Sequence, residues 1–81
     1  MTREEFGKVP FKYGGHLSLE CEHQSSYYNE QYGFGFVDIT KMKCGGMEVG
    51  KTHREYYYKG KYYRKLDKFL EAIKDVEYIN Q

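Results

Sequence analysis

The sequence predicts an α+β fold, in which a small antiparallel β-sheet of three to five strands packs against a C-terminal amphipathic α-helix, with a short helix at the N-terminus. Three patterns support this prediction. Apolar and polar side chains alternate over residues 16–24, as in a strand with one covered face. A Lys59-Gly60 pair separates two tyrosine-rich runs, and apolar residues recur at helical spacing over residues 66–76. The length of 81 residues suits a single domain, residues 1–81.

The N-terminal segment predicts a short helix. Thr2 suits the N-cap position, and Glu5, three residues later, is the matching partner in a capping box. Gly7 ends this helix, and Pro10 prevents its continuation. Residues 9–13 then form a short extended segment at a sheet edge, because proline has no N–H group to pair with a neighbouring strand.

The next part of the chain predicts a turn at Gly14-Gly15 and a strand over residues 16–24. The apolar face of that strand consists of Leu17, Leu19, Cys21 and His23. Residues 25–31 are polar apart from two tyrosines, so we expect them to form a connection between strands.

A second strand is predicted over residues 32–40. Its two faces carry Val37 and Ile39 on one side and Phe34 and Phe36 on the other. Gly33 and Gly35 weaken this strand and indicate either a bulge or a close approach of another part of the chain. Residues 41–50, which are rich in glycine, are predicted to form a loop.

The C-terminal part predicts a hairpin followed by a helix. Residues 51–58 and 61–64 pair around a two-residue turn at Lys59-Gly60. The helix then places five apolar side chains along one stripe: Leu66, Phe69, Leu70, Ile73 and Val76. Lys65 occupies the N-cap position, where a side chain that accepts hydrogen bonds is preferred, so this helix begins without a side-chain cap.

The composition restricts the class of protein. Ten Tyr and five Phe residues outnumber the eleven Leu, Ile and Val residues, so we expect tyrosine rings in the core. No apolar run approaches the ~20 residues of a membrane-spanning helix. The net charge is +1, which is unlike a disordered tail, but it divides into −3 over residues 1–40 and +4 over residues 41–81.

The N-terminus and the cysteines predict a cytoplasmic protein. Glu4, Glu5 and Lys8 interrupt the apolar stretch that a secretory signal requires. Small disulfide scaffolds have a higher density of cysteine than this chain, which contains only Cys21 and Cys44. We therefore expect both cysteines to be free thiols in a reducing compartment.

The most unusual stretch is residues 51–65, which combine six basic side chains with five tyrosines and a single carboxylate. Nucleic-acid bases stack on aromatic rings while cations follow the phosphates, so this hairpin suits single-stranded nucleic acid or RNA. The alternative interpretation is structural. Tyr56 and Tyr58 would share one face of the strand, Tyr57 would take the other, and one set would pack under the C-terminal helix.

Tyrosine is also enriched at the centres of protein–protein interfaces, because its ring is large, stiff and amphipathic. Tyr27, Tyr28 and Tyr32 lie in a polar segment beside glycines and suit such a contact. The candidate binding residues are therefore Lys51, Arg54, Tyr56, Tyr58, Lys59, Lys61, Tyr62, Arg64, Lys65, Tyr27 and Tyr28.

Metal binding and catalysis have little support in the sequence. Four donors match no zinc-ligand spacing: Cys21, His23, Cys44 and His53. Glu20 and Glu22 share a strand face with no predicted cleft, and Gly33-x-Gly35 lacks the third glycine and the helix of a phosphate-binding loop. We expect no enzymatic activity, no metal and no cofactor.

The sequence thus predicts a small non-catalytic binding protein that acts as an inhibitor or adaptor. A protein partner would dock on a tyrosine-rich surface, and no membrane is involved. The alternative is a nucleic-acid partner bound along the basic tyrosine hairpin, residues 51–65.

Overall fold

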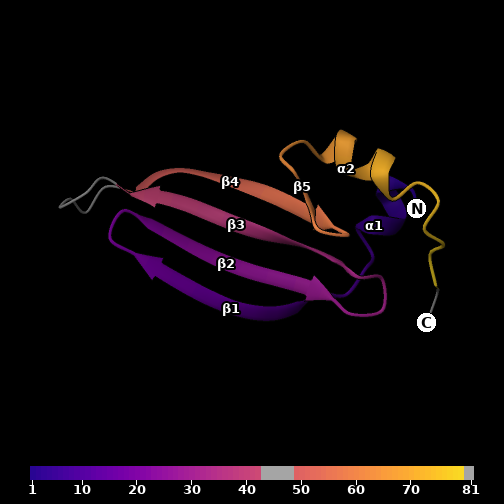
Figure 1. Cartoon of the computed structure of the whole chain (residues 1–81), viewed down its shortest axis with the longest axis horizontal. Coiled ribbons are helices and arrows are strands. Elements are labelled where there is room, and N and C mark those ends of the chain that lie inside the picture. The colour runs from indigo at the N-terminus through magenta and orange to yellow at the C-terminus, as the bar shows by residue number, and fades with distance from the viewer. Residues whose placement is uncertain (43–48, 80–81) are drawn as a thin grey trace.

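The computed structural model describes residues 1–42 and 49–79 of the chain. Five strands form one sheet in the order β1-β2-β3-β4-β5, with every neighbouring pair antiparallel (Figure 1). The elements in chain order are α1 (Arg3–Phe6), β1 (Lys12–Leu19), β2 (Glu22–Asn29), β3 (Phe34–Met42), β4 (Val49–Tyr58), β5 (Lys61–Tyr63) and α2 (Leu66–Ala72). The predicted α+β class and the antiparallel sheet are confirmed.

The first half of the sheet differs from the prediction. Residues 16–24 are not one strand, because a turn at Glu20 and Cys21 separates β1 from β2, and Leu19 pairs with Glu22. The alternation of side chains continues through this turn, and the turn contains neither glycine nor asparagine, so the pattern gave no sign of it. The predicted connection over residues 25–31 is mostly strand, since β2 extends to Asn29.

The predicted turn at Gly14-Gly15 lies within β1. The pairing of β1 with β2 shifts register between Tyr13 and Gly15, and Gly15 has a φ of 142°. A residue with a side chain rarely adopts this conformation, so the glycine permits an irregularity in the edge strand. Of the predicted loop 41–50, Lys41 and Met42 belong to β3 and Val49 and Gly50 to β4. Residues 43–48 lie outside the described residues.

The hairpin of β4 and β5 is confirmed. Tyr58 pairs with Lys61 across a two-residue turn in which Lys59 has a φ of 49° and Gly60 a φ of 79°. Two positive φ angles are characteristic of a type I′ turn, whose twist matches that of the flanking strands.

The predicted caps of both helices are also confirmed. In α1 the Glu5 amide donates to Thr2 Oγ1 at 3.2 Å, and the Thr2 amide donates to Glu5 Oε1 at 2.8 Å. In α2, Lys65 occupies the N-cap position and makes no side-chain cap hydrogen bond. The helix ends at Ala72, earlier than the apolar stripe suggested, and a turn follows it.

Aromatic rings form the core on one face of the sheet, which we call the covered face. One row of aromatic residues on this face crosses all five strands. Each member pairs with the next on the neighbouring strand, in the order Tyr13, Tyr27, Phe36, Tyr56 and Tyr63. Phe69 of α2 is fully buried and stacks on Tyr56, with the ring centroids 5.0 Å apart, and Phe6 of α1 contacts Phe69 at 5.4 Å. The expectation that tyrosine contributes to the core is confirmed.

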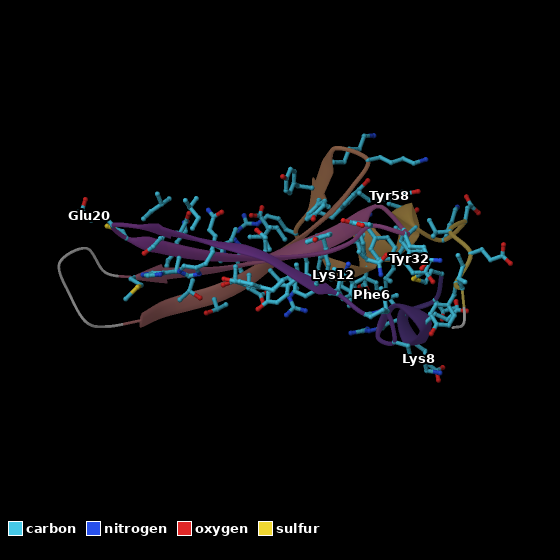
Figure 2. The ribbon with its side chains drawn as sticks, turned by 90° about the horizontal axis from the view of Figure 1, so that it is seen from below. Phe6, Lys8, Lys12, Glu20, Tyr32 and Tyr58 are labelled. Atoms are coloured by element: carbon cyan, nitrogen blue, oxygen red, sulfur yellow. The ribbon has the colours of Figure 1, made fainter. Side chains whose placement is uncertain are left out.

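The helices occupy one end of an elongated molecule that measures 45 × 22 × 22 Å (Figure 1). Phe6, Tyr32 and Tyr58 lie at this end, whereas Glu20 lies at the opposite end of the sheet (Figure 2). The Met1 ammonium group donates to the carbonyls of Ile73 and Lys74 at 3.0 and 2.9 Å, which links the N-terminus to the end of α2. Neither helix of the described chain has the length and apolar character needed to cross a bilayer.

Candidate functional site

Three tyrosines from three strands lie at the same level on the other face of the sheet, which we call the open face. Tyr28 of β2 and Tyr57 of β4 both pair with Gly35 of β3, and Tyr57 also pairs with Tyr62 of β5. The core cluster around α1 and α2 contains none of these three tyrosines. We call Tyr28, Tyr57 and Tyr62 the tyrosine band.

Glycines hold two rings of the band against the sheet. A Cβ atom at Gly35 would lie 2.6 Å from Tyr57 Oη and would also collide with the Tyr27 carbonyl oxygen. At Gly14 a Cβ atom would lie 3.1 Å from Cδ1 of Tyr28. The absence of these side chains lets the tyrosine rings lie over the backbone, so the close approach predicted at Gly35 is confirmed.

The exposure and electrostatics of the band follow from this arrangement. Tyr62 is 67% exposed, and its ring centroid lies 5.9 Å from that of Tyr57. Partial burial raises the pKa of Tyr57, and the neighbouring phenols of Tyr62 and Tyr28 raise it further. The Tyr57 hydroxyl donates a long hydrogen bond of 3.5 Å to the Tyr27 carbonyl. Tyr57 therefore keeps a neutral hydroxyl group at ordinary pH, at the centre of a row of aromatic rings.

The open face continues away from the band with apolar and acidic side chains. Leu17 and Leu19 of β1 are 51% and 48% exposed. Glu22, paired with Leu19, and Glu55, paired with Val37, add carboxylates to the same face. At the β1 side of the band, a hollow of ≈ 250 Å³ is lined by residues that include Pro10, Lys12 and Tyr28. Lys12, paired with Tyr28, and Lys41, paired with Glu22, add cations to this face, which thus mixes aromatic, apolar, acidic and basic groups.

The structure divides the tyrosines that the sequence selected between the two faces. Tyr28 and Tyr62 belong to the band. Tyr56 is 9% exposed beneath α2, and Tyr27 and Tyr58 pack against the core cluster from the covered face. Tyr56 and Tyr58 therefore pack in or against the core, as the structural interpretation of the hairpin predicts, and Tyr27 of β2 does the same.

Arg54, another selected residue, is engaged on the covered face. Its Nε donates to Asp38 Oδ1 at 2.6 Å and its Nη2 donates to Asp38 Oδ2 at 3.1 Å. The guanidinium carbon also lies 4.0 Å from the centroid of the Phe36 ring. Hydrogen bonding to Asp38 raises the pKa of Arg54, so this cation is already paired within the fold.

The other selected cations are exposed and fall into two groups. Lys51 lies near the start of β4, eight residues before Lys59, which corresponds to about 26 Å along a strand. The second group surrounds the end of the hairpin and consists of Lys59, Lys61, Arg64 and Lys65. Lys59 Nζ lies 5.3 Å from the centroid of the Tyr58 ring.

The four donors considered for zinc are not assembled within the described chain. Cys21 lies in the β1–β2 turn and is disulfide-bonded, which contradicts the expectation of a free thiol. His23 projects from the covered face and His53 from the open face, as their pairing with Thr40 and Ile39 requires. Cys44 lies outside the described residues. In residues 1–42 and 49–79, no three His, Cys, Asp or Glu side chains gather around a possible metal position.

The sequence selected Tyr56 and Tyr58 but not Tyr57, which the structure places at the centre of the band. The signal for Tyr57 was present, because alternation puts it on the opposite face from its two neighbours. Alternation does not show which of the two faces of the sheet the helices cover.

Comparison of the chain with protein-family models, with curated proteins and with solved structures finds no match.

Proposed function

We propose that this is a non-catalytic binding protein that contacts a protein partner through the tyrosine band of the open face. The observation behind the proposal is the row of Tyr28, Tyr57 and Tyr62, which come from three strands and lie outside the core cluster. Large amphipathic rings at the centre of an interface contribute most of its binding energy. An inhibitor or adaptor acting by contact alone needs such a surface and no reactive groups.

The band is prepared for binding before a partner arrives. Tyr57 and Tyr28 lie against Gly35 and Gly14, so their rings have little conformational freedom left to lose. Tyr62, at 67% exposure, has apolar area available to a partner. Hydroxyl groups at the edge of such a patch provide hydrogen bonds and orientation.

The surroundings of the band favour protein over nucleic acid. Leu17 and Leu19 extend the apolar area along the same face, and protein partners cover such side chains. Glu22 and Glu55 share this face with Lys12 and Lys41, so charges of both signs mix there, unlike the cationic track that a phosphate backbone follows. A protein surface with its own apolar and charged groups complements this mixture.

The test is affinity capture followed by a direct binding measurement. The tagged chain would be used to capture partners from the cells that produce it, and the captured protein would be purified and titrated by calorimetry. Tyr57→Ser and Tyr62→Ser should each weaken binding by about tenfold or more, since hot-spot residues contribute 2 kcal/mol or more. Tyr13→Ser is the matched control, because Tyr13 is 59% exposed but lies on the covered face.

The proposal fails if the band variants bind the purified partner as tightly as the wild type does. It also fails if Tyr13→Ser is the damaging substitution, because the interface would then lie on the other face. Circular dichroism and the midpoint of urea denaturation establish that each variant is folded.

A nucleic-acid partner is the second candidate, and one observation favours it. Lys59, Lys61 and Arg64 are exposed around the same hairpin that carries Tyr62. If this surface binds single-stranded DNA or RNA, affinity should fall steeply with salt, and the triple alanine variant should lower the salt slope by about two to three. Unchanged fluorescence polarisation of labelled oligonucleotides at low salt would exclude this candidate.

The cytoplasmic location remains a prediction. The disulfide at Cys21 is an observation against it, since disulfides persist mainly in oxidising compartments. Alkylation of the protein in intact cells, followed by mass spectrometry, measures the content of free thiols. This decides between a reducing cytoplasmic location and an oxidising compartment.

A further inference from the structure

Two histidines meet on the β1–β2 hairpin, at a part of the covered face where the sheet turns polar. His16 pairs with Ser25 and His23 pairs with Ser18, which places the two imidazoles diagonally across the strands. His16 Nε2 and His23 Nδ1 lie 3.2 Å apart, and the ring centroids are 5.3 Å apart with the planes inclined by 37°. One ring nitrogen donates a proton to the other, so a single proton occupies the space between two nitrogen donors.

The groups around the pair are hydroxyls and an ion pair that is already complete. Ser25 Oγ lies 3.2 Å from His16 Nδ1, and Ser18 Oγ lies 3.4 Å from His23 Nδ1. On the next strands, Asp38 pairs with Ser25 and is bound to Arg54 at 2.6 Å. The Arg54 cation on the neighbouring strand β4 is therefore already paired with a carboxylate.

We propose that His16 and His23 form a binding site for a divalent transition-metal ion, and for Zn²⁺ in particular. Two nitrogens that bind one tetrahedral zinc ion at about 2.0–2.1 Å are separated by about 3.4 Å, whereas a right angle at the metal requires about 2.9 Å. The observed 3.2 Å is nearer to the tetrahedral separation. The backbone of the hairpin therefore already holds the two donors at the spacing that zinc needs.

Zinc takes the place of the shared proton, which moves to the other nitrogen of the same imidazole, so each ring stays neutral and keeps one N–H. Each nitrogen lone pair must turn by about 40° away from the line that joins the two nitrogens, so that both point at the ion. His16 is exposed and the second side-chain torsion of histidine is broad, so this rotation meets little resistance. Ser25 then accepts a hydrogen bond from His16 Nδ1–H, which fixes the ring with Nε2 directed at the metal.

The site offers two protein ligands and leaves two positions to water. Among the described residues no third His, Cys, Asp or Glu completes a ligand group there, so we expect weaker binding than at a site with three or four protein ligands. The site lies on the opposite face from the tyrosine band, so it does not depend on the proposed function.

Calorimetric titration with ZnCl₂ tests the proposal, using the full chain without a histidine tag, in a non-chelating buffer without reductant. Reductant is omitted because a reduced Cys21 would itself bind zinc. We expect saturable binding of one zinc ion per chain. His16→Gln and His23→Gln should each weaken zinc binding by more than about tenfold. Removing a ligand lowers the affinity for the metal more than removing a residue that only orients a ligand.

The third histidine of the chain provides the matched control. His53 lies on the open face, 3.8 Å from Glu55, and His53→Gln should bind zinc as the wild type does. NMR spectra of the imidazole nitrogens should show the signals of His16 and His23, and not those of His53, move on addition of zinc. Ser25→Ala should weaken binding by about tenfold or less, because it removes only the orienting hydrogen bond.

The proposal is overturned if the wild type shows no saturable binding at millimolar ZnCl₂. It is also overturned if His16→Gln and His23→Gln leave the affinity unchanged, or if His53→Gln abolishes binding. Both substituted histidines lie at the surface, and an unchanged urea midpoint for each variant separates loss of the site from loss of the fold.

Discussion

The two faces of the sheet are built from the same three tyrosine pairs and differ in what lies over them. In each of the pairs 27–28, 56–57 and 62–63, one ring projects to the covered face and its neighbour to the open face. Tyr56 is 9% exposed beneath α2, whereas Tyr62 is 67% exposed. Composition therefore says nothing about the role of a tyrosine in this protein, and its position in the strand alternation decides the role.

The faces also hold their rings in different ways. On the covered face, Phe6 and Phe69 pack over the tyrosines, so the rings are fixed by other aromatic rings. On the open face, the fixing element is the backbone below the rings, at Gly35 and Gly14. Substitutions should therefore act through lost contacts on the covered face and through added volume on the open face.

The largest effect is expected for Phe69→Ala on the covered face. Phe69 is fully buried and contacts rings from α1 and β4, so its truncation should cost about 3–5 kcal/mol of unfolding free energy. A domain of this size has only about 4–12 kcal/mol in total. Urea denaturation measures the loss. A cost below 1 kcal/mol would mean that α2 is not a structural cover, and the distinction between the two faces would fail.

Gly35→Ala tests the support of the open face and should have the next largest effect. The new methyl group would collide with the Tyr27 carbonyl and with Tyr57 Oη, so we expect a cost of about 1–3 kcal/mol. Gly14→Ala is the matched control with a smaller cost, because only the edge of the Tyr28 ring has to move. Equal stability of the Gly35→Ala variant and the wild type would contradict the close packing of Tyr57 against the backbone.

The sequence predicted those parts of the fold that depend on residues close together in the chain. The capping box of Thr2 and Glu5 and the turn at Lys59-Gly60 depend on neighbouring residues alone, and both were predictable. The turn at Glu20 and Cys21 was not, because neither residue favours a turn and the alternation runs through it unbroken. The Met42 amide at the end of β3 donates to the Cys21 carbonyl at 2.8 Å, so a segment distant in the sequence contacts this turn.

The missed turn had consequences for the candidate sites. In one continuous strand, His16 and His23 would lie about 23 Å apart and on opposite faces. The hairpin brings their nitrogens to 3.2 Å on the same face. Tyr57 was overlooked for a different reason, since its face was predictable from alternation but the position of the helices was not.

Tyr62→Ala should have a small effect on stability. Its ring is 67% exposed and contacts Tyr57 as a cross-strand pair, which typically contributes about 0.2–1 kcal/mol. Tyr13→Ala, at 59% exposure on the covered face, provides the comparison. Urea denaturation of both variants should give losses within this range. A loss above 2 kcal/mol for Tyr62→Ala would assign that ring to the core.

The smallest expected effect concerns the pKa of Tyr57 in the tyrosine band. Burial and the neighbouring phenols raise the pKa of Tyr57 above the usual 10.0, so an ultraviolet titration should show a step above that pH. Tyr57→Phe should remove this late step. Because the unfolded chain loses the proton first, the stability linked to Tyr57 is complete below pH 10 and declines as the pH rises from there through the raised pKa.

The neighbours of Tyr57 identify the cause of that late step. Tyr62→Phe removes one neighbouring phenol but keeps the ring, so it should bring the pKa of Tyr57 closer to its usual value without exposing it. Burial is the larger cause, so most of the rise should remain in this variant. If Tyr57→Phe removes no step above pH 10.0 from the titration, the Tyr57 ring does not lie against Gly35, and the tyrosine band loses its central member.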